Sequence, residues 1–294
     1  MARSGRRSLA RSERSRTSLN VSTHRPIGRP RSRAPIATRE EPTVRHIAAE
    51  VPLTVRLIVG PTGVGKSAAA SDVARRTGAP VVVADRIQCF TDLATTSARA
   101  GADEPDVTRA WLGDRTVADG DYPAPEAAAA LVRAVRRVAR PGRPVVVEGG
   151  SISLLAYLVD HHLPVLPWRF TVTSLTRPAP SRYLAALTAR AHAMLRPEPP
   201  LAGLLDELAA LWRVPGHRWF AASVNGFEAA LEWCAKYGLD PTEPTLVGLP
   251  PRLVDELALL IAERHAEHGA DQERAFAALF APAARAGVRL GDAA

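Results

Sequence analysis

Residues 60–67 read GPTGVGKS, a complete P-loop with the pattern GxxxxGK[ST]. An apolar run at 55–59 precedes this loop, and a segment typical of a helix, 66–77, follows it and ends before Gly78. Glycines permit the backbone angles that turn successive N–H groups toward one anion, and a helix N-terminus adds positive potential. The stretch therefore predicts a strand, a phosphate-binding loop and a helix.

The loop residues are expected to bind a phosphate or a diphosphate. Lys66 supplies a mobile ammonium group, and Ser67 is placed to hold Mg²⁺, the expected cofactor. The diphosphate-binding set within the loop is Gly60, Thr62, Gly63, Val64, Gly65, Lys66 and Ser67. The motif does not identify the phosphate compound, because kinases share it and need an acidic group after a second apolar strand. Both 81–85 (VVVAD) and 145–148 (VVVE) fit that pattern, which leaves a small-molecule kinase open.

Strand and helix signals alternate up to about residue 177 and become almost purely helical after it. The chain therefore predicts an α/β fold, a P-loop NTPase-like parallel sheet with flanking helices over residues 53–177. A smaller C-terminal helical lobe is expected over 178–294. Further strands are predicted at 80–84, 145–147 and 170–172, helices at 124–140, 181–195, 201–212, 218–237, 252–268 and 271–280, and mainly loops at 85–123.

The basic excess lies at the N-terminus. The chain holds 38 basic and 30 acidic residues, and residues 1–50 hold 12 Arg and 4 Glu, so the net charge of 51–294 is zero. Residues 1–52 are predicted to be a disordered basic extension, with a misplaced start, an organellar transit peptide and a nucleic-acid-binding arm as alternatives. A neutral body argues against a tRNA-binding surface.

The remaining composition indicates a soluble cytoplasmic bacterial protein. No apolar run approaches the roughly 20 residues of a membrane span. The cysteines, Cys89 and Cys234, show no metal-ligand or disulfide spacing. We expect a monomer that binds neither a membrane nor nucleic acid.

Three further stretches stand out: ADRIQC at 84–89, LGDR at 112–115 and VEGGSISLL at 147–155. Together with the P-loop and QER at 272–274, they resemble the bacterial adenylate isopentenyltransferases over residues 53–280. The related tRNA dimethylallyltransferases typically have Ser where this chain has Arg86, and Gly-Gly-Thr-Gly where it has Gly-Gly-Ser-Ile-Ser. The resemblance implies transfer of a dimethylallyl (isopentenyl) group from its diphosphate to N6 of AMP, or of ADP or ATP. That reaction is the first step of cytokinin biosynthesis.

The resemblance also implies roles for individual residues. Asp85, at the end of the predicted second strand, would take the proton of the adenine amine. Lys66 and Arg190 would neutralise the diphosphate leaving group and are the other catalytic candidates. The AMP-binding candidates are Asp85, Arg86, Ser97, Arg115 and Ser151. Helix capping is the plain alternative for Ser151, and a surface ion pair is the alternative for Arg115.

The prenyl pocket is where this chain departs from the family pattern. The family has an Asp where this chain has Asn225, which is expected to line the pocket together with His268. His265 and His268, one helical turn apart, fit a solvated helix face better than a metal site. The choice between a dimethylallyl, hydroxylated or longer donor stays open. A tRNA adenosine dimethylallyltransferase and a non-catalytic nucleotide-binding protein also stay open.

Overall fold

The computed structural model describes residues 52–285, apart from 103 and 244–245, and gives only the backbone of 282–285. The predicted N-terminal extension therefore lies outside the described residues, except for Pro52. All the described residues fall within one compact unit.

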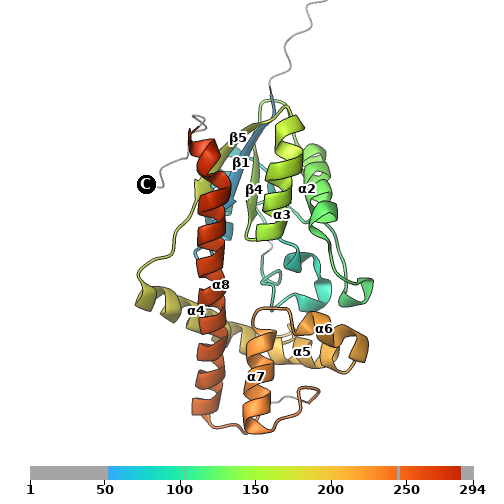
Figure 1. The fold of residues 1–294 in the computed structure, drawn as a ribbon, viewed down its shortest axis with the longest axis vertical. Helices are drawn as coiled ribbons and strands as arrows, with labels where there is room; N and C mark the ends of the chain where they lie inside the picture. Colours follow the sequence, from blue (N-terminus) through green and yellow to red (C-terminus); the bar gives the residue numbers. More distant parts are fainter. Residues whose placement is uncertain (1–51, 103, 244–245, 286–294) are drawn as a thin grey trace, which may run out of the picture. The chain divides into compact units, whose positions relative to one another are not determined.

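Five parallel strands form one sheet in the order β3-β2-β4-β1-β5 (Figure 1). Their bounds are β1 Thr54–Val59, β2 Val81–Val83, β3 Arg109–Ala110, β4 Val145–Gly149 and β5 Arg169–Ser174. The predicted α/β fold with a parallel sheet is confirmed. Strand β3 lies within the segment predicted as loops, because so short a strand carries no detectable pattern.

Helices cover both faces of the sheet. On one face, Ile58, Val81 and Val146 pack against Ala70 and Ala74 of α1 (Lys66–Thr77). On the other face, alternate residues of the same strands pack against α2 (Ala124–Val138) and α3 (Ile152–Tyr157), which lie side by side in Figure 1. Burial on both faces explains why the strands are continuous apolar runs rather than alternating patterns.

The strand order brings chemistry-bearing segments to one edge. The P-loop follows β1, Asp85 follows β2, and Glu148 lies near the end of β4, which pairs with both β1 and β2. In open α/β sheets the carboxyl ends of the strands form the ligand-binding crevice. These three segments therefore meet where a ligand is expected.

The C-terminal part of the described chain is helical. Its helices are α4 Pro180–Leu195, α5 Leu204–Trp212, α6 Arg218–Ala221, α7 Phe227–Tyr237 and α8 Pro251–Arg285. Short helical turns lie along the chain at η1 Ile87–Cys89, η2 Thr91–Leu93, η3 Val117–Asp119, η4 Leu158–His162, η5 Leu163–Val165 and η6 Pro215–His217.

Two helix predictions in this part are wrong. The single helix predicted at 218–237 is two helices, because the backbone of Gly226 adopts a positive φ of 99° between them. The separate helices predicted at 252–268 and 271–280 are one helix, α8, which runs through Gly269. A lone glycine costs a helix only about 1 kcal/mol, so tertiary contacts readily outweigh it.

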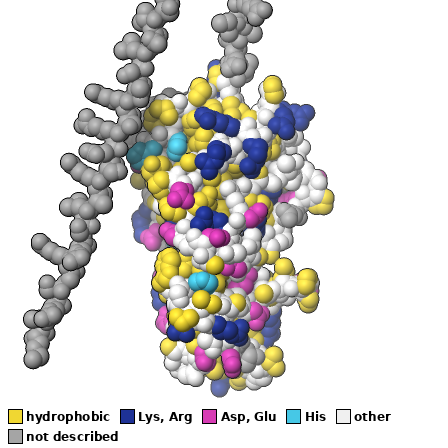
Figure 2. Space-filling model, turned by 90° about the vertical axis from the view of Figure 1, so that its right-hand side faces the viewer, with side chains coloured by type: hydrophobic (Ala, Val, Ile, Leu, Met, Phe, Trp, Pro, Cys, Tyr) yellow, Lys and Arg dark blue, Asp and Glu magenta, His cyan; other side chains and the backbone are white. Residues whose placement is uncertain are grey.

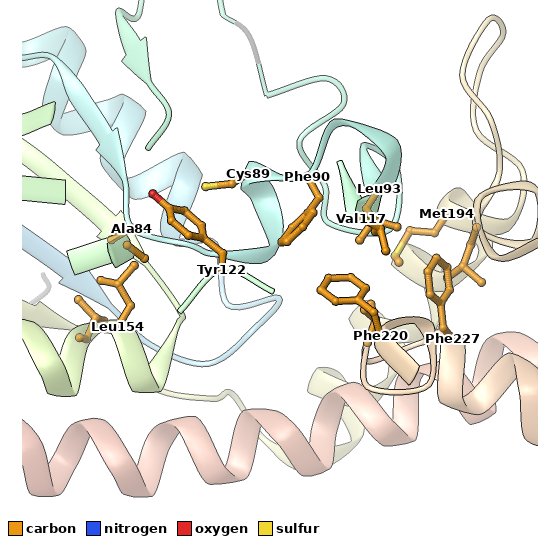
Figure 3. Packing of buried hydrophobic residues seen from close by; sticks show 14 of the residues in the cluster. Ala84, Cys89, Phe90, Leu93, Val117, Tyr122, Leu154, Met194, Phe220 and Phe227 are labelled. Atoms are coloured by element: carbon orange, nitrogen blue, oxygen red, sulfur yellow. The ribbon is translucent and has the colours of Figure 1, made fainter. Parts of the chain in front are cut away.

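One apolar cluster joins the strand-rich and helical parts. It contains Leu57 of β1 together with Leu208 of α5 and Phe227 of α7. At the junction, the ring centroids of Phe90 and Phe220 lie 4.8 Å apart (Figure 3). The boundary near residue 177 stays a prediction, since the apolar core is continuous across it.

On the face shown in Figure 2, Lys and Arg side chains gather at the upper end, and charged side chains of both signs are interspersed below it. Exposed arginines of α2 include Arg133, Arg136 and Arg137, and the last two lie in its final turn. Positive charge at a helix C-terminus is favourable because it complements the helix dipole. Among the helices of the described residues, none is long and apolar enough to cross a lipid bilayer.

Candidate active site

A cavity of about 760 Å³ opens at the carboxyl ends of the strands and is lined by residues from both parts of the chain. Most of the site residues predicted from the sequence line it. They are Thr62, Gly63, Gly65, Lys66, Ser67, Asp85, Arg86, Ser97, Ser151, Arg190, Asn225 and His268. Segments that lie far apart in the sequence thus contribute to one site.

Two predicted loop residues lie outside the cavity lining. Gly60 is buried at the end of β1, and a Cβ there would lie 2.7 Å from the carbonyl oxygen of Leu175. Val64 packs against a small apolar cluster with Tyr183 and Leu187 of α4. Both residues therefore shape the loop, and their contacts are with protein rather than with the cavity.

Arg115 does not line the cavity, so the structure gives no support to its predicted contact with AMP. Its guanidinium donates to the carbonyl oxygens of Asp119 (3.0 Å) and Asp121 (3.3 Å). It also lies 4.8 Å from the centroid of the Tyr122 ring. These partners make Arg115 a structural residue of the segment between β3 and α2.

Two half-buried cations face the cavity. The ammonium of Lys66 donates to the carbonyl oxygen of Pro61 at 2.7 Å, and Arg190 keeps its Nε buried with no hydrogen-bond partner among the described residues. Burial lowers the pKa of Lys66 and of Arg190, against the opposing effect of Asp85. Neither belongs to an ion pair within the described chain. Desolvated cations that lack a protein counterion are suited to an anionic ligand.

Asp85 lies at the same cavity, and no cation of the described chain is in ion-pair contact with it. One carboxylate oxygen accepts the backbone N–H of Ile87 at 3.0 Å. Burial raises the pKa of Asp85, and the nearby Lys66 opposes that rise. A carboxylate of raised pKa that faces a cavity is suited to accept a proton during a reaction.

A second carboxylate, Glu148, is held in a hydrogen-bonded network. Ser67 Oγ donates to Glu148 Oε1 at 2.9 Å, and Arg109 Nη1 donates to the same oxygen at 3.1 Å. The side chains of Glu148 and Arg109 are only 2% and 3% exposed. Burial raises the pKa of Glu148, while Ser67 and Arg109 lower it. The sequence offers Glu148 as a kinase-type acidic group, and in the structure its carboxylate fixes the hydroxyl of Ser67.

The wall around Ser97 is strained and firmly anchored. Thr96, Ser97 and Ala98 line the cavity, and Ala98 adopts a left-handed backbone with a φ of 59°. Buried Glu207 of α5 accepts the backbone N–H groups of Thr95 (2.7 Å) and Thr96 (2.9 Å). The helical part of the chain thereby holds the segment that carries Ser97.

Arg86 and Ser151 complete the predicted adenylate set at the cavity. Arg86 Nη1 donates to the carbonyl oxygen of Tyr122 at 2.7 Å, while its Nε is buried without a partner in the described chain. Ser151 occupies the N-cap position of α3, but its side chain makes no capping hydrogen bond. Helix capping therefore does not use the hydroxyl of Ser151.

The wall opposite the strands carries neutral polar groups. Asn225 and His268 line the cavity as predicted, and so does His265. The interpretation of His265 as part of a solvated face is wrong: it is 5% exposed, and its Nδ1 has no hydrogen-bond partner among the described residues. Burial lowers the pKa of His265 to about 4 and also lowers the pKa of His268. Both shifts favour the neutral form of the imidazole.

Gln272 is absent from the predicted site residues, yet it belongs to the site. It is 4% exposed, lines the cavity and bonds to the P-loop through Thr62. The signal that could have found it is spacing, because His265, His268 and Gln272 stand at i, i+3 and i+7 on one helix face. The prediction of two separate helices here hides that periodicity.

Comparison with known proteins identifies the family of this chain. The family model described as isopentenyl transferase matches residues 53–286. The chain is 40% identical over 227 residues to an adenylate dimethylallyltransferase of Rhodococcoides fascians, covering 77% of this chain and 89% of that protein. It is 32% identical to an adenylate dimethylallyltransferase of Ralstonia solanacearum, covering 77% and 94%.

Solved structures share the fold at low sequence identity. A eukaryotic dimethylallyltransferase acting on tRNA matches with a TM-score of 0.55 and 14% identity, covering 81% of this chain and 73% of that one. A tRNA isopentenylpyrophosphate transferase from Staphylococcus epidermidis matches with a TM-score of 0.53 and 13% identity, covering 78% and 90%. The resemblance seen in the sequence is confirmed: the chain belongs to the isopentenyl transferase family and is a prenyltransferase.

Proposed function

We propose that the protein transfers a dimethylallyl group from dimethylallyl diphosphate to N6 of AMP. The observation that carries this proposal is the juxtaposition in one cavity of Asp85 with Lys66 and Arg190, two cations outside the ion pairs of the described chain. One group accepts a proton, and the other two neutralise a leaving diphosphate. The product is the first intermediate of cytokinin biosynthesis, which is the biological role we propose.

The chemistry is a displacement at C1 of the prenyl group. The N6 lone pair forms a bond to C1 while the bond from C1 to the diphosphate oxygen breaks, and the N6 proton passes to Asp85. An adenine amine is a weak nucleophile because its lone pair is delocalised into the ring. A carboxylate at N6 therefore orients the amine as well as accepting its proton. Negative charge grows on the diphosphate, where the P-loop N–H groups, Lys66 and Arg190 stabilise it.

The residues present also fit Mg²⁺, which we propose as the cofactor. Mg²⁺ in phosphate sites is bound by few protein ligands and by substrate oxygens. Ser67 would provide one ligand through Oγ, whose hydroxyl donates a hydrogen bond to Glu148 Oε1 over an Oγ to Oε1 distance of 2.9 Å. When bound, the ion would neutralise charge on the diphosphate.

Incubation of the protein with AMP, dimethylallyl diphosphate and Mg²⁺ tests the proposal. We expect diphosphate release and a prenylated AMP, both resolved by mass spectrometry. IMP is the matched control, since it has a carbonyl oxygen where AMP has the amine, and it should give no product. Parallel arms with ADP, ATP and unmodified tRNA as acceptors identify the preferred one. Prenylation of tRNA alone would contradict the proposal, and ATP consumption without prenyl transfer would indicate a kinase.

A further inference from the structure

Gln272 connects α8 to two segments at the strand ends. Its Oε1 accepts the backbone N–H of Thr62 at 2.7 Å, and its Nε2 donates to the carbonyl oxygen of Gly150 at 2.7 Å. The P-loop after β1 and the turn after β4 are therefore tied to the same side chain. Of the natural side chains of this length, only Gln offers one acceptor and one donor together at these positions.

Thr62 is held from a second helix as well. The hydroxyl of Tyr183, on α4, donates to the Thr62 carbonyl oxygen at 2.7 Å. Both backbone polar groups of Thr62 are thus bonded to side chains, one from α4 and one from α8, while Thr62 itself lines the cavity. We call Tyr183 and Gln272 together the Thr62 clamp.

Helices α4 and α8 pack so closely against each other and against the loops at the strand ends that side chains are excluded at three glycines. A Cβ on Gly63 would lie 2.6 Å from a terminal carbon of Leu187, and one on Gly150 would lie 2.8 Å from Gln272 Nε2. A Cβ on Gly269 of α8 would collide with the hydroxyl of Tyr183. The Thr62 clamp is therefore part of a tightly packed contact between the C-terminal helices and the loop.

We infer that Gln272 and Tyr183 are positioning residues that fix the backbone of Thr62 and thereby preset the P-loop for the donor diphosphate. The inference rests on the proposed function for the identity of that diphosphate. A flexible glycine loop must lose conformational freedom when it binds an anion, and a peptide fixed beforehand loses less. The C-terminal helices thus contribute to phosphate binding, although the Thr62 clamp bonds only the backbone of the loop.

Calorimetric titration of inorganic diphosphate and of AMP, each in the presence of Mg²⁺, tests this inference. In Gln272→Met, which matches the length but has no oxygen or nitrogen atoms in its side chain, we expect the Kd for diphosphate to rise by about tenfold to a hundredfold, the scale of one or two lost hydrogen bonds. The Kd for AMP should rise by less than the Kd for diphosphate, because on the nucleotide side only the bond to Gly150, next to Ser151, is removed. In turnover, KM for the donor should rise more than KM for AMP.

Two further variants separate positioning from plain stability. Tyr183→Phe should raise the Kd for diphosphate by about threefold to tenfold, the scale of one hydrogen bond. The double variant should fall short of the product of the single effects, because both side chains hold the backbone of the same residue, Thr62. Arg274→Ala is the control, since Arg274 lies on the same helix, is exposed and forms its ion pair with Asp271. It should leave both Kd values unchanged.

A failure of this inference can be told apart from a failure of the proposed prenyl transfer. A wild type that binds diphosphate but does not prenylate AMP contradicts the proposed reaction and leaves the Thr62 clamp intact. If Gln272→Met lowers the Tm but binds diphosphate as the wild type does, the clamp is only structural and the inference is overturned. Equal loss of diphosphate and AMP affinity, or a wild type that does not bind diphosphate, overturns it too.

Discussion

Two carboxylates lie at the ends of neighbouring strands of the same sheet, and their partners differ. Burial raises the pKa of both Asp85, after β2, and Glu148, near the end of β4. Glu148 is bonded to the guanidinium of Arg109 and to the hydroxyl of Ser67. Asp85 accepts the backbone N–H of Ile87 and makes no ion pair in the described chain.

This difference shows that position at a strand end does not by itself decide chemistry. A buried carboxylate bonded to a cation and a hydroxyl is held in one orientation, so we expect it to serve as a fixed part of the site. A carboxylate withdrawn from solvent without a cationic bond can change its protonation during a reaction. We therefore expect Glu148 to have a structural use and Asp85 a chemical one.

The strongest test of the contrast is Asp85→Asn. Loss of the proton acceptor should lower the single-turnover rate of prenyl transfer by about 10²–10⁴. Diphosphate affinity and the free energy of unfolding should stay near those of the wild type, because no ion pair is broken. Rapid-quench kinetics and urea denaturation measure the two effects. Retention of half the activity would show that Asp85 is not the base.

Glu148→Gln should affect the free energy of unfolding more than the rate of prenyl transfer. The variant removes one of the two carboxylates bonded to buried Arg109 and leaves Glu104 at 3.3 Å. The loss of unfolding free energy should therefore lie below the roughly 3–5 kcal/mol of a buried charge left with no partner. Urea denaturation measures that loss. The matched control is the double variant Glu148→Leu with Arg109→Met, which removes both charges and should recover part of the loss. A single variant as stable as the wild type would show that the ion pair contributes little.

The pH dependence of kcat/KM distinguishes the same two groups. The proposed base Asp85 can accept a proton only when it is ionised, and because burial raises its pKa, activity should fall on acidification at a pH above the ordinary value of about 3.9. This acid limb should vanish from the residual activity of Asp85→Asn and persist in Glu148→Gln. An acid limb that is identical in all three proteins would assign it to a substrate phosphate.

The smallest expected effect comes from adding a carboxylate where the cavity has a neutral amide. Asn225→Asp should shift donor preference toward 4-hydroxydimethylallyl diphosphate by about 1–2 kcal/mol, the scale of a hydrogen bond to a charged acceptor. Competition between the two donors measures the ratio, with Asn225→Ala as the control that lacks an acceptor. The wild type should use dimethylallyl diphosphate at least as well. A strong native preference for the hydroxylated donor would implicate His265 or His268 instead.

Local patterns predicted the strand-rich part of the chain closely. The bounds of α1 are those predicted, because a P-loop fixes where a helix begins and Gly78 adopts the left-handed backbone that ends it. Likewise, Lys66, Ser67 and Asp85 follow strands whose apolar runs are unambiguous. Parallel pairing then places them together without further information.

The helical part was harder to predict because tertiary contacts override its local signals. Gly269 suggests a helix end in sequence, but it lies inside α8, where Tyr183 leaves no room for a side chain. His265 and Gln272 are polar and such residues are often exposed, yet both are buried against the cavity. Arg115 lies in a stretch that resembles the family, although its guanidinium is bonded to nearby carbonyl oxygens.

Because α8 is one continuous helix, it fixes the relative positions of the residues that it contributes to the cavity. His265, His268, Gly269 and Gln272 lie along one stripe, so the imidazoles at one wall and the amide bound to the P-loop are rigidly spaced on a single rod. In an α-helix, each added residue turns everything beyond it by about 100°. One residue inserted between His268 and Gln272 would therefore uncouple the two ends of the site, even though every contacting side chain would still be present in the sequence.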